Sequence, residues 1–317
     1  MVQSPEWDIV VVEGAYTDYV VRGPELPAQG ETVRGKELLI LPGGKGANQA
    51  VAAARLGARH VAFVGRVGND DRGQEIIHQF QVEHVDTRYV LPSHSLPTGI
   101  SLIQVNEQGH KQMMVALGAS QALTLEDIHR ASAALTSTRI LLTQLEVPVE
   151  TARAALRLAR ESGATIIFDP APAASLPGDL FPLLDVIKPD AKEAETLTGI
   201  PVTDRDTARA APHALMRRGA RSVVVQAGSQ GDLAVWNGGE RWLPRIPLKA
   251  VDSTGAGDTL AAALAVAFVE GRSLDEAGPF SSAAAALKTT KSGARSGLPY
   301  RQQVEDLLSR LKEQQAQ

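Results

Sequence analysis

The segment of the chain with the clearest chemical potential is Asp252-Ser-Thr-Gly-Ala-Gly-Asp258, which leads into an alanine-rich stretch. Glycines let a main chain approach a ligand closely, and the first N–H groups of a helix have no partners within that helix. With the positive end of the helix dipole, the N–H groups of Gly255, Ala256 and Gly257 are predicted to form a cradle for an anion such as phosphate. Asp258 lies beside this cradle and can accept a proton from an attacking hydroxyl. The alternative is a tight turn in which Asp258 only caps the helix.

A second glycine-rich segment, Leu41-Pro-Gly-Gly-Lys-Gly-Ala-Asn-Gln-Ala50, leads into another predicted helix. It does not match the Gly-x-x-x-x-Gly-Lys-Ser/Thr pattern of a P-loop, but its small residues let a ligand lie against the main chain. Asn48 has both hydrogen-bond donors and acceptors, which suits a pair of hydroxyls on a polyol. The alternative is an ordinary glycine loop with an exposed Lys45.

Two further segments carry weaker signals. Asp190 and Glu193 are three residues apart at the predicted start of a helix. Carboxylates in that position either hold Mg²⁺ through water or cap the helix, and read alone the segment favours the cap. The segment Gln226-Ala-Gly-Ser-Gln-Gly231 follows an apolar run and can flank a nucleotide, although most such turns bind nothing.

The composition argues against several classes of protein. The 317 residues include no cysteine, which excludes disulfides, thiolate metal sites and cysteine nucleophiles. Lys plus Arg is 32, Asp plus Glu is 36 and aromatic residues are 4 %, so neither charge nor stacking surface favours nucleic-acid binding. Neither a Gly-x-Ser-x-Gly elbow nor a dinucleotide-binding Gly-x-Gly-x-x-Gly after the first strand is present. We expect no membrane span, no signal peptide and a cytoplasmic location.

The elements that must position these residues alternate between helices and buried strands. Helical stretches over 47–56, 151–162 and 207–218 each end at a glycine, a residue that stops helices readily. Apolar runs without polar alternation are typical of strands covered on both faces, and they occur at 8–12, 60–64, 139–144, 165–168 and 222–225. The sequence therefore predicts a three-layer α/β/α sandwich with a mostly parallel central sheet.

Two regions, about 15–41 and 98–117, interrupt this alternation. The segment Ile100–Val105 alternates in polarity, and the turn residues Asn106–Gly109 follow it. We predict that these regions form antiparallel strands of a small separate sheet, which acts as a lid over a site at the strand ends.

Together these segments resemble the ribokinases and the wider PfkB carbohydrate kinase family along nearly the whole chain. The segment 43–49 resembles the family's N-terminal signature, and 252–258 resembles its highly specific C-terminal signature. The resemblance implies one kinase domain over 1–317, with a β-lid that often makes the dimer contact. It implies transfer of the γ-phosphoryl group of ATP to a primary hydroxyl of a pentose or related sugar, ribose first among them.

The same resemblance implies a role for each matching position. Asp258 matches the catalytic base, and Gly255, Ala256 and Gly257 match the anion hole. The remaining positions fall into three groups: sugar contacts at Asp18, Gly44, Lys45, Asn48 and Glu146; the nucleotide region at Asp190, Gln226, Gly228, Ser229, Gly231 and Ser282, with Glu193 as the acid associated with Mg²⁺ and phosphate; and a monovalent-cation site for K⁺ at Asp252, Thr254, Lys288, Lys291, Gly293 and Gly297, mostly through carbonyl groups.

Four departures from the family pattern bear on these expectations. The segment Gly14–Asp18 is one residue shorter than usual, which re-aims the side chains after it and leaves other acceptors open: fructose or another ketose, a deoxy sugar acid, or a nucleoside. Asp190 replaces an Asn, Ser282 replaces a His, and Gly297 replaces a Ser that serves as a cation ligand. The remaining alternative is a sugar-binding regulatory protein without catalysis, which an intact 255–258 segment disfavours.

Overall fold

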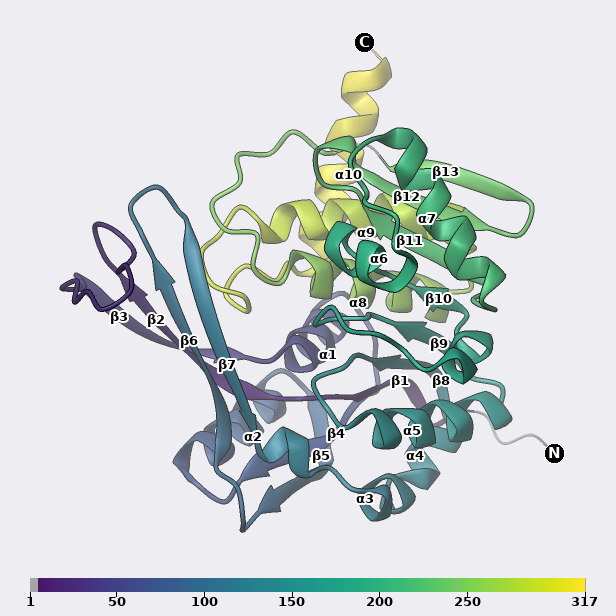
Figure 1. Cartoon of the computed structure of the whole chain (residues 1–317). Coiled ribbons are helices and arrows are strands. Elements are labelled where there is room, and N and C mark those ends of the chain that lie inside the picture. The colour runs from purple at the N-terminus through teal and green to yellow at the C-terminus, as the bar shows by residue number, and fades with distance from the viewer. Residues whose placement is uncertain (1–4, 244, 317) are drawn as a thin grey trace.

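The computed structural model describes residues 5–243 and 245–316, which form an α/β body and a small sheet that projects from it (Figure 1). The central sheet of the body has nine strands in the order β13-β12-β11-β10-β9-β8-β1-β4-β5. All neighbouring pairs are parallel except β11 with β12 and β12 with β13. The strands are β1 (Trp7–Val12), β4 (Val61–Gly68), β5 (Val85–Ser93), β8 (Thr138–Thr143), β9 (Thr165–Phe168), β10 (Val186–Ile187), β11 (Ser222–Gln226), β12 (Asp232–Trp236) and β13 (Gly239–Leu243).

Helices cover both faces of this sheet, as predicted for a three-layer sandwich. One layer contains α1 (Lys45–Arg55), α2 (Asp71–Val82), α8 (Ala256–Val269), α9 (Leu274–Lys288) and α10 (Arg301–Ala316). The other contains α3 (Leu125–Arg130), α4 (Ser132–Thr136), α5 (Val149–Glu161), α6 (Ala191–Thr198) and α7 (Arg205–Arg217). Short 3₁₀ turns occur at Ala119–Ala122, Gly178–Leu183 and Gly228–Gln230.

The buried faces explain why the strands read as continuous apolar runs. In β1, Ile9 and Val11 pack into one core and Val10 and Val12 into the other. Burial of both faces removes the polar alternation that a half-exposed strand would show. Burial on all sides also explains why α8 lacks a polar face, because each residue from 258 to 267 is buried. Its many alanines let the helix fit between the sheet and the neighbouring helices.

The lid has four strands, β2 (Tyr16–Arg22), β3 (Glu37–Gly43), β6 (Thr98–Val105) and β7 (Lys111–Gly118), in the order β3-β2-β6-β7. The lid strands lie in the two predicted regions of the chain. The prediction that all of them pair antiparallel needs one correction, because the central strands β2 and β6 are parallel and only the outer pairs are antiparallel. The reason is the chain path, because β2 and β6 are separated by α1, β4, α2 and β5 of the body and both enter the lid in the same direction.

In the described part of the chain, no helix combines the length and the apolar character that a membrane span requires.

Candidate active site

Polar side chains collect at one edge of the central sheet, where its parallel strands end. Glu13 follows β1, Asp169 follows β9 and Lys188 follows β10, while Gln226 is the last residue of β11. Carboxyl ends of parallel strands share one edge of a sheet, and open α/β sheets bind ligands there. The helices α1 and α8 also begin at this edge, so both glycine-rich segments of the sequence meet the strand ends.

Asp258 lies in the first turn of α8, and its carboxylate is directed at α1. Its Oδ2 accepts a hydrogen bond from Asn48 Nδ2 at 2.9 Å. The helix is capped by Gly255, which has a φ of 82° and makes no side-chain cap bond among the described residues, so the capping alternative for Asp258 is wrong. Burial raises the pKa of Asp258, and Asp169 adds to this, whereas Lys45 lowers it. The group is therefore a buried carboxylate with an increased affinity for a proton.

The anion cradle before α8 is narrower than the sequence predicts. The N–H of Ala256 donates to Ser253 O at 3.1 Å and is occupied by the turn itself. Within the part of the chain that the structure describes, the N–H groups of Gly255 and Gly257 have no such partner. A methyl group added to Gly257 would lie 3.3 Å from Lys188 Nζ, so an ammonium group stands beside the cradle.

Lys188 is a site residue that the sequence interpretation did not single out. Its side chain is 2 % exposed, and its Nζ lies 3.2 Å from Asp169 Oδ2 and donates to Gln226 Oε1 at 3.1 Å. Burial acts to lower the pKa of Lys188, but Asp169, Glu193 and Asp258 outweigh it, and the pKa is raised. The group stays charged where phosphate would bind. Its position directly after the short apolar run of β10 was the available signal.

The glycines of the 43–46 segment are required by close contacts. A Cβ on Gly43 would lie 2.3 Å from Asp18 Oδ1, and one on Gly46 would lie 2.1 Å from Glu13 Cβ. Gly44 has a φ of 93°, and a Cβ added to it would lie 2.8 Å from Gly14 O, so no other residue fits without strain. These glycines bring α1 against β1 and the lid strand β2.

Glu146 links this segment to the body. Its Oε1 accepts from Tyr16 Oη at 2.9 Å and its Oε2 accepts from the Lys45 N–H at 3.1 Å. Burial raises the pKa of Glu146 to about 7, against the opposing attraction of Lys45. Burial also acts to lower the pKa of Lys45, but Asp258 and Glu146 more than offset it. The Lys45 ammonium is thus under the electrostatic influence of both Asp258 and Glu146.

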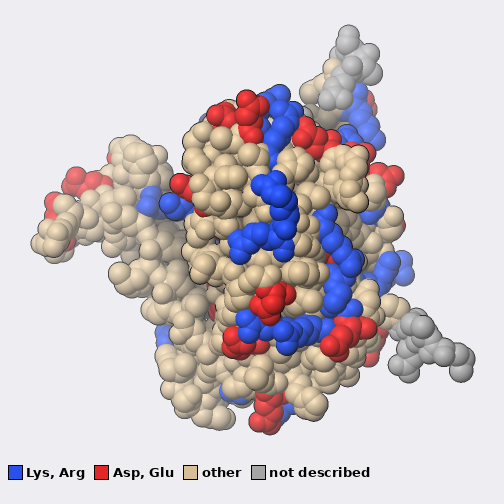
Figure 2. Space-filling model, turned by 45° about the vertical axis from the view of Figure 1, so that its right-hand side comes forward, with Lys and Arg blue, Asp and Glu red and all other residues tan. Residues whose placement is uncertain are grey.

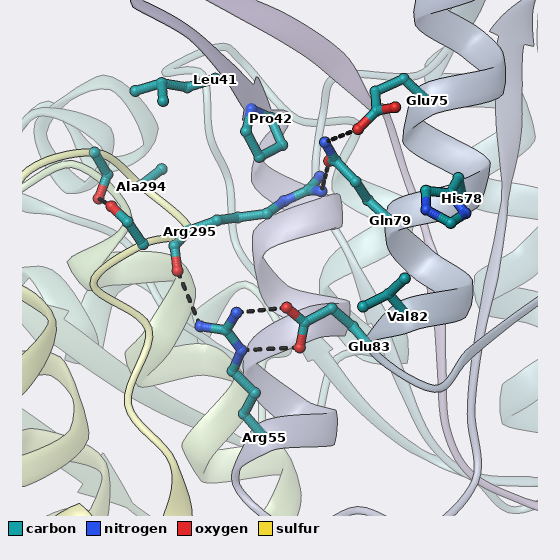
Figure 3. A pocket seen from close by; sticks show the side chains of 12 residues that line it. Leu41, Pro42, Arg55, Glu75, His78, Gln79, Val82, Glu83, Ala294 and Arg295 are labelled. Atoms are coloured by element: carbon teal, nitrogen blue, oxygen red, sulfur yellow. Dashed lines mark hydrogen bonds and ion pairs between the residues drawn. The ribbon is translucent and has the colours of Figure 1, made fainter.

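Asp18 lies in the lid strand β2, not at the end of the first body strand, and it is 7 % exposed. Its Oδ1 accepts the Ser101 hydroxyl of β6. Burial raises the pKa of Asp18, while Arg295 and Lys45 lower it. Arg295 donates to Gly43 O at 3.2 Å. It also donates to Gln79 Oε1 at 2.9 Å (Figure 3). Ser101 and Arg295 were missed because only the fold brings them to Asp18.

The pocket of Figure 3 lies around Arg295 and the Arg55–Glu83 ion pair, away from this chemistry. Of the described residues that line it, none is an expected catalytic, sugar or nucleotide residue, and Gly293 alone is an expected cation position. We therefore treat it as part of the support for the 293–295 loop.

Five of the expected nucleotide residues line a cavity of about 400 Å³ at the end of β11 and the start of α8. Around it the structure brings together Gln226, Gly228, Ser229, Gly231 and Ser282. Its other walls are mainly apolar, which suits a planar heterocycle. Ser282 Oγ is buried without a hydrogen-bond partner among the described residues, and it is available to a ligand in the cavity.

Asp190 and Glu193 form a capping box at the start of α6. Asp190 Oδ1 accepts from the Glu193 N–H and Glu193 Oε2 accepts from the Asp190 N–H, both at 2.8 Å. The Asp190 carboxylate therefore caps the N-terminus of α6. Asp190 does not line the cavity described above. Glu193 is buried, and burial together with repulsion from Asp169 raises its pKa to about 7.

These acids bear on the expected Mg²⁺. The described residues contain no group of three or more His, Asp or Glu side chains placed to hold a metal. However, Asp169 Oδ1 is buried without a partner among them and repels Glu193. Mg²⁺ in such sites is held chiefly by phosphate oxygens and water with one or two carboxylates, and Asp169 and Glu193 fit that requirement.

The lid contacts the cradle through a residue that the sequence interpretation did not use. Lys111 of β7 donates from Nζ to Thr254 Oγ1 at 3.1 Å. Both residues line a cavity of about 300 Å³ between the lid and the 250–254 loop, which Asp18 also lines.

The expected K⁺ positions come together, but they do not fit a K⁺ ion. The Asp252 carboxylate accepts hydrogen bonds from the N–H groups of Thr254 and Gly293, both at 2.9 Å. Lys288 Nζ donates to Asp252 O at 2.9 Å and to Lys291 O at 3.4 Å. An ammonium group of the chain itself therefore occupies the carbonyl groups that were expected to bind the ion.

The fold and the site define a class of protein, an α/β phosphotransferase with a carboxylate base beside a phosphate cradle. The chain belongs to the pfkB family carbohydrate kinases, whose sequence pattern matches residues 8–301. It is accordingly a kinase that transfers phosphate from ATP to a sugar hydroxyl.

Individual relatives agree with this assignment. A ribokinase of Haemophilus influenzae is 36 % identical over 300 residues, covering 95 % of this chain and 98 % of the relative. A deoxyribokinase of Salmonella typhi is 32 % identical, covering 95 % and 99 %. The structure of Arabidopsis thaliana ribokinase complexed with ribose and ATP matches with a TM-score of 0.86 at 31 % identity, covering 96 % of this chain and 99 % of that one.

Proposed function

We propose that this protein is a ribokinase, a single kinase domain with a lid that phosphorylates the primary 5-hydroxyl of D-ribose. The observation that carries the proposal is the buried Asp258 carboxylate, held by Asn48 beside the free N–H groups of Gly255 and Gly257. Relatives that are named ribokinases, with identities up to 36 % over almost the whole chain, support the choice of ribose.

In the proposed reaction Asp258 accepts the proton of the sugar hydroxyl as its oxygen attacks the γ-phosphorus. The bond from that phosphorus to the β,γ-bridging oxygen breaks, and ADP leaves with the electron pair. Lys188 and the N–H groups of the cradle stabilise the negative charge on the transferring group, where fixed donors contribute most. Asp169 and Glu193 would hold the Mg²⁺ that accompanies ATP, and the ion would neutralise further charge on the phosphates.

The acceptor side of the proposed site uses charged side chains for the ribose hydroxyls. Asp18, Asn48 and Glu146 supply acceptor oxygens, while Lys45 and the amide of Asn48 donate. Burial raises the pKa values of Asp18 and Glu146 because it removes water from these carboxylates. Sugar hydroxyls that donate hydrogen bonds to them would take the place of that water.

An acceptor screen tests this proposal. The purified protein is assayed for ADP formation with ribose, 2-deoxyribose, fructose, 2-keto-3-deoxygluconate and adenosine, and the product is characterised by ³¹P NMR. We expect the highest kcat/KM with ribose and a phosphate ester on C5. A higher kcat/KM with another acceptor would reassign the substrate. Sugar binding without ADP formation would support a regulatory protein.

We also propose a homodimer formed through the lid, in the cytoplasm, where ATP is available. The outer lid face exposes Leu38, Ile40, Leu102 and Met114, which share that face by their strand register and form an apolar group of the kind that marks protein–protein contacts. Figure 2 shows the lid projecting as a largely uncharged surface beside a body with mixed charges. Sedimentation of the wild type and of Met114→Glu tests the dimer; a monomeric wild type would exclude it.

A further inference from the structure

Lys288 is a buried lysine whose side chain lies beside the loop that leads into the phosphate cradle. It is the last residue of α9 and its side chain is 0 % exposed. Buried ammonium groups are costly unless carbonyl or carboxylate oxygens surround them. A lysine retained in such a position therefore indicates a specific set of oxygen partners.

Those partners belong to the loops on either side of the phosphate cradle. Nζ donates to Asp252 O on the segment that leads into Gly255, and to Lys291 O on the following loop. The Asp252 carboxylate fixes the same two loops through Thr254 N and Gly293 N. The ammonium thus joins the structural elements that a bound monovalent cation would join, with the same unit charge.

Gly297 shows why the lysine fits. A Cβ at this position would lie 2.7 Å from Lys288 O and 2.8 Å from Lys288 Cδ. A serine at 297, the cation ligand of the resemblance, would therefore collide with the Lys288 side chain. The contact with the Lys288 carbonyl oxygen would also exclude a serine if another residue stood at 288, whereas the contact with Cδ shows that Gly297 leaves room for the lysine side chain.

We propose that the Lys288 ammonium replaces the monovalent cation beside the cradle, so that this kinase works without K⁺. Lys288 is then a positioning residue that orders the 252–257 loop and never contacts the sugar. A K⁺ ion at the same carbonyls would meet this ammonium at contact distance, so repulsion excludes it.

The first test measures kinase rates in K⁺, Na⁺ and tetramethylammonium salts at constant ionic strength. The wild type is expected to have the same kcat/KM in all three within about twofold, far below a typical coupling effect of 5- to 150-fold. Lys288→Ala is expected to be slow in Na⁺ and to recover roughly tenfold or more in K⁺ or NH₄⁺. Lys249→Ala, an exposed lysine three residues before Asp252, is the matched control and is expected to show no ion dependence.

A second test does not depend on activity, and this separates the inference from the proposed substrate. Crystals soaked in Tl⁺ are expected to show no anomalous peak at the Asp252 and Lys291 carbonyls in the wild type, and a peak there in Lys288→Ala. The thermal midpoint is expected to respond to K⁺ only in the variant; Lys288→Met serves if the alanine variant does not fold. A Tl⁺ peak at these carbonyls in the wild type, a wild type strongly activated by K⁺, or a variant as active as the wild type without K⁺ would each overturn the proposal.

Discussion

The two halves of the site are built from different materials. The proposed acceptor half contains carboxylates that accept hydrogen bonds from hydroxyl groups, such as Glu146 from Tyr16 and Asp18 from Ser101. The nucleotide half consists of glycines, small side chains and an apolar cavity. A sugar is distinguished by the directions of its hydroxyls, which side chains can match, whereas a polyanion is held by main-chain N–H groups that need close approach. We therefore expect substitutions that remove polar atoms to reduce activity most in the acceptor half. Substitutions that add atoms to glycines should reduce activity most in the nucleotide half.

The largest expected effect comes from removing the charge of Asp258, where the two halves meet. Asp258→Asn keeps the shape but cannot accept the hydroxyl proton, so kcat should fall by roughly 10²–10⁴. Steady-state kinetics with ATP and ribose measure it, with exposed Asp306→Asn as the control. Near-normal turnover, after contaminating kinases are excluded, would remove the proposed role.

The next effect tests the nucleotide half by adding one methyl group. Gly257→Ala places a carbon 3.1 Å from Gln226 Oε1 and 3.3 Å from Lys188 Nζ, which narrows the cradle. We expect kcat/KM for ATP to fall by roughly 10²-fold, comparable to loss of one oxyanion donor. Removing atoms in the same half should matter less, and Ser282→Ala should change the KM for ATP by no more than about threefold. A larger effect of Ser282→Ala than of Gly257→Ala would reverse the comparison.

A smaller effect is expected from Asp18, on the acceptor half. Asp18→Asn removes a charged acceptor, and the KM for ribose should rise by roughly tenfold while the KM for ATP stays the same. Ser101→Ala removes only the donor that orients Asp18 and should raise the same KM by less. Equal changes in both KM values would show that the variant disturbs the whole site.

The smallest effect concerns stability and pH. The folded pKa of Glu146, about 7, lies above the unfolded value, so the folded state binds the proton more tightly. This contribution is fully present below about pH 4 and is lost as pH rises to about 7. Glu146→Gln should therefore gain thermal stability relative to the wild type between these values, with about 1 kcal/mol moving Tm by roughly 2 °C in a protein of this size. A constant difference in Tm between the two proteins across this range would contradict it.

The sequence predicted the body of the fold well because its strands are buried on both faces and its helices end at glycines. The predicted antiparallel pairing of the lid holds for its two outer pairs and is wrong for β2 with β6, because strand direction depends on the path of the intervening chain, which local residue patterns do not record. Asp258 and Asn48 were predicted as site residues from their glycine-rich surroundings, and the structure brings the two side chains within hydrogen-bond distance. Lys188 and Arg295 were missed because their partners are distant in sequence. Lys188 forms an ion pair with Asp169, and Arg295 donates a hydrogen bond to Gly43 O.

The sequence by itself determined which segments carry the chemistry, because glycine spacing and helix starts are local properties of the chain. Only the tertiary structure decided how charges are distributed between those segments. It assigned Lys288 to the expected cation site, because that assignment depends on the distance from its ammonium to the Asp252 carbonyl, two groups that only the folded chain brings within hydrogen-bond reach.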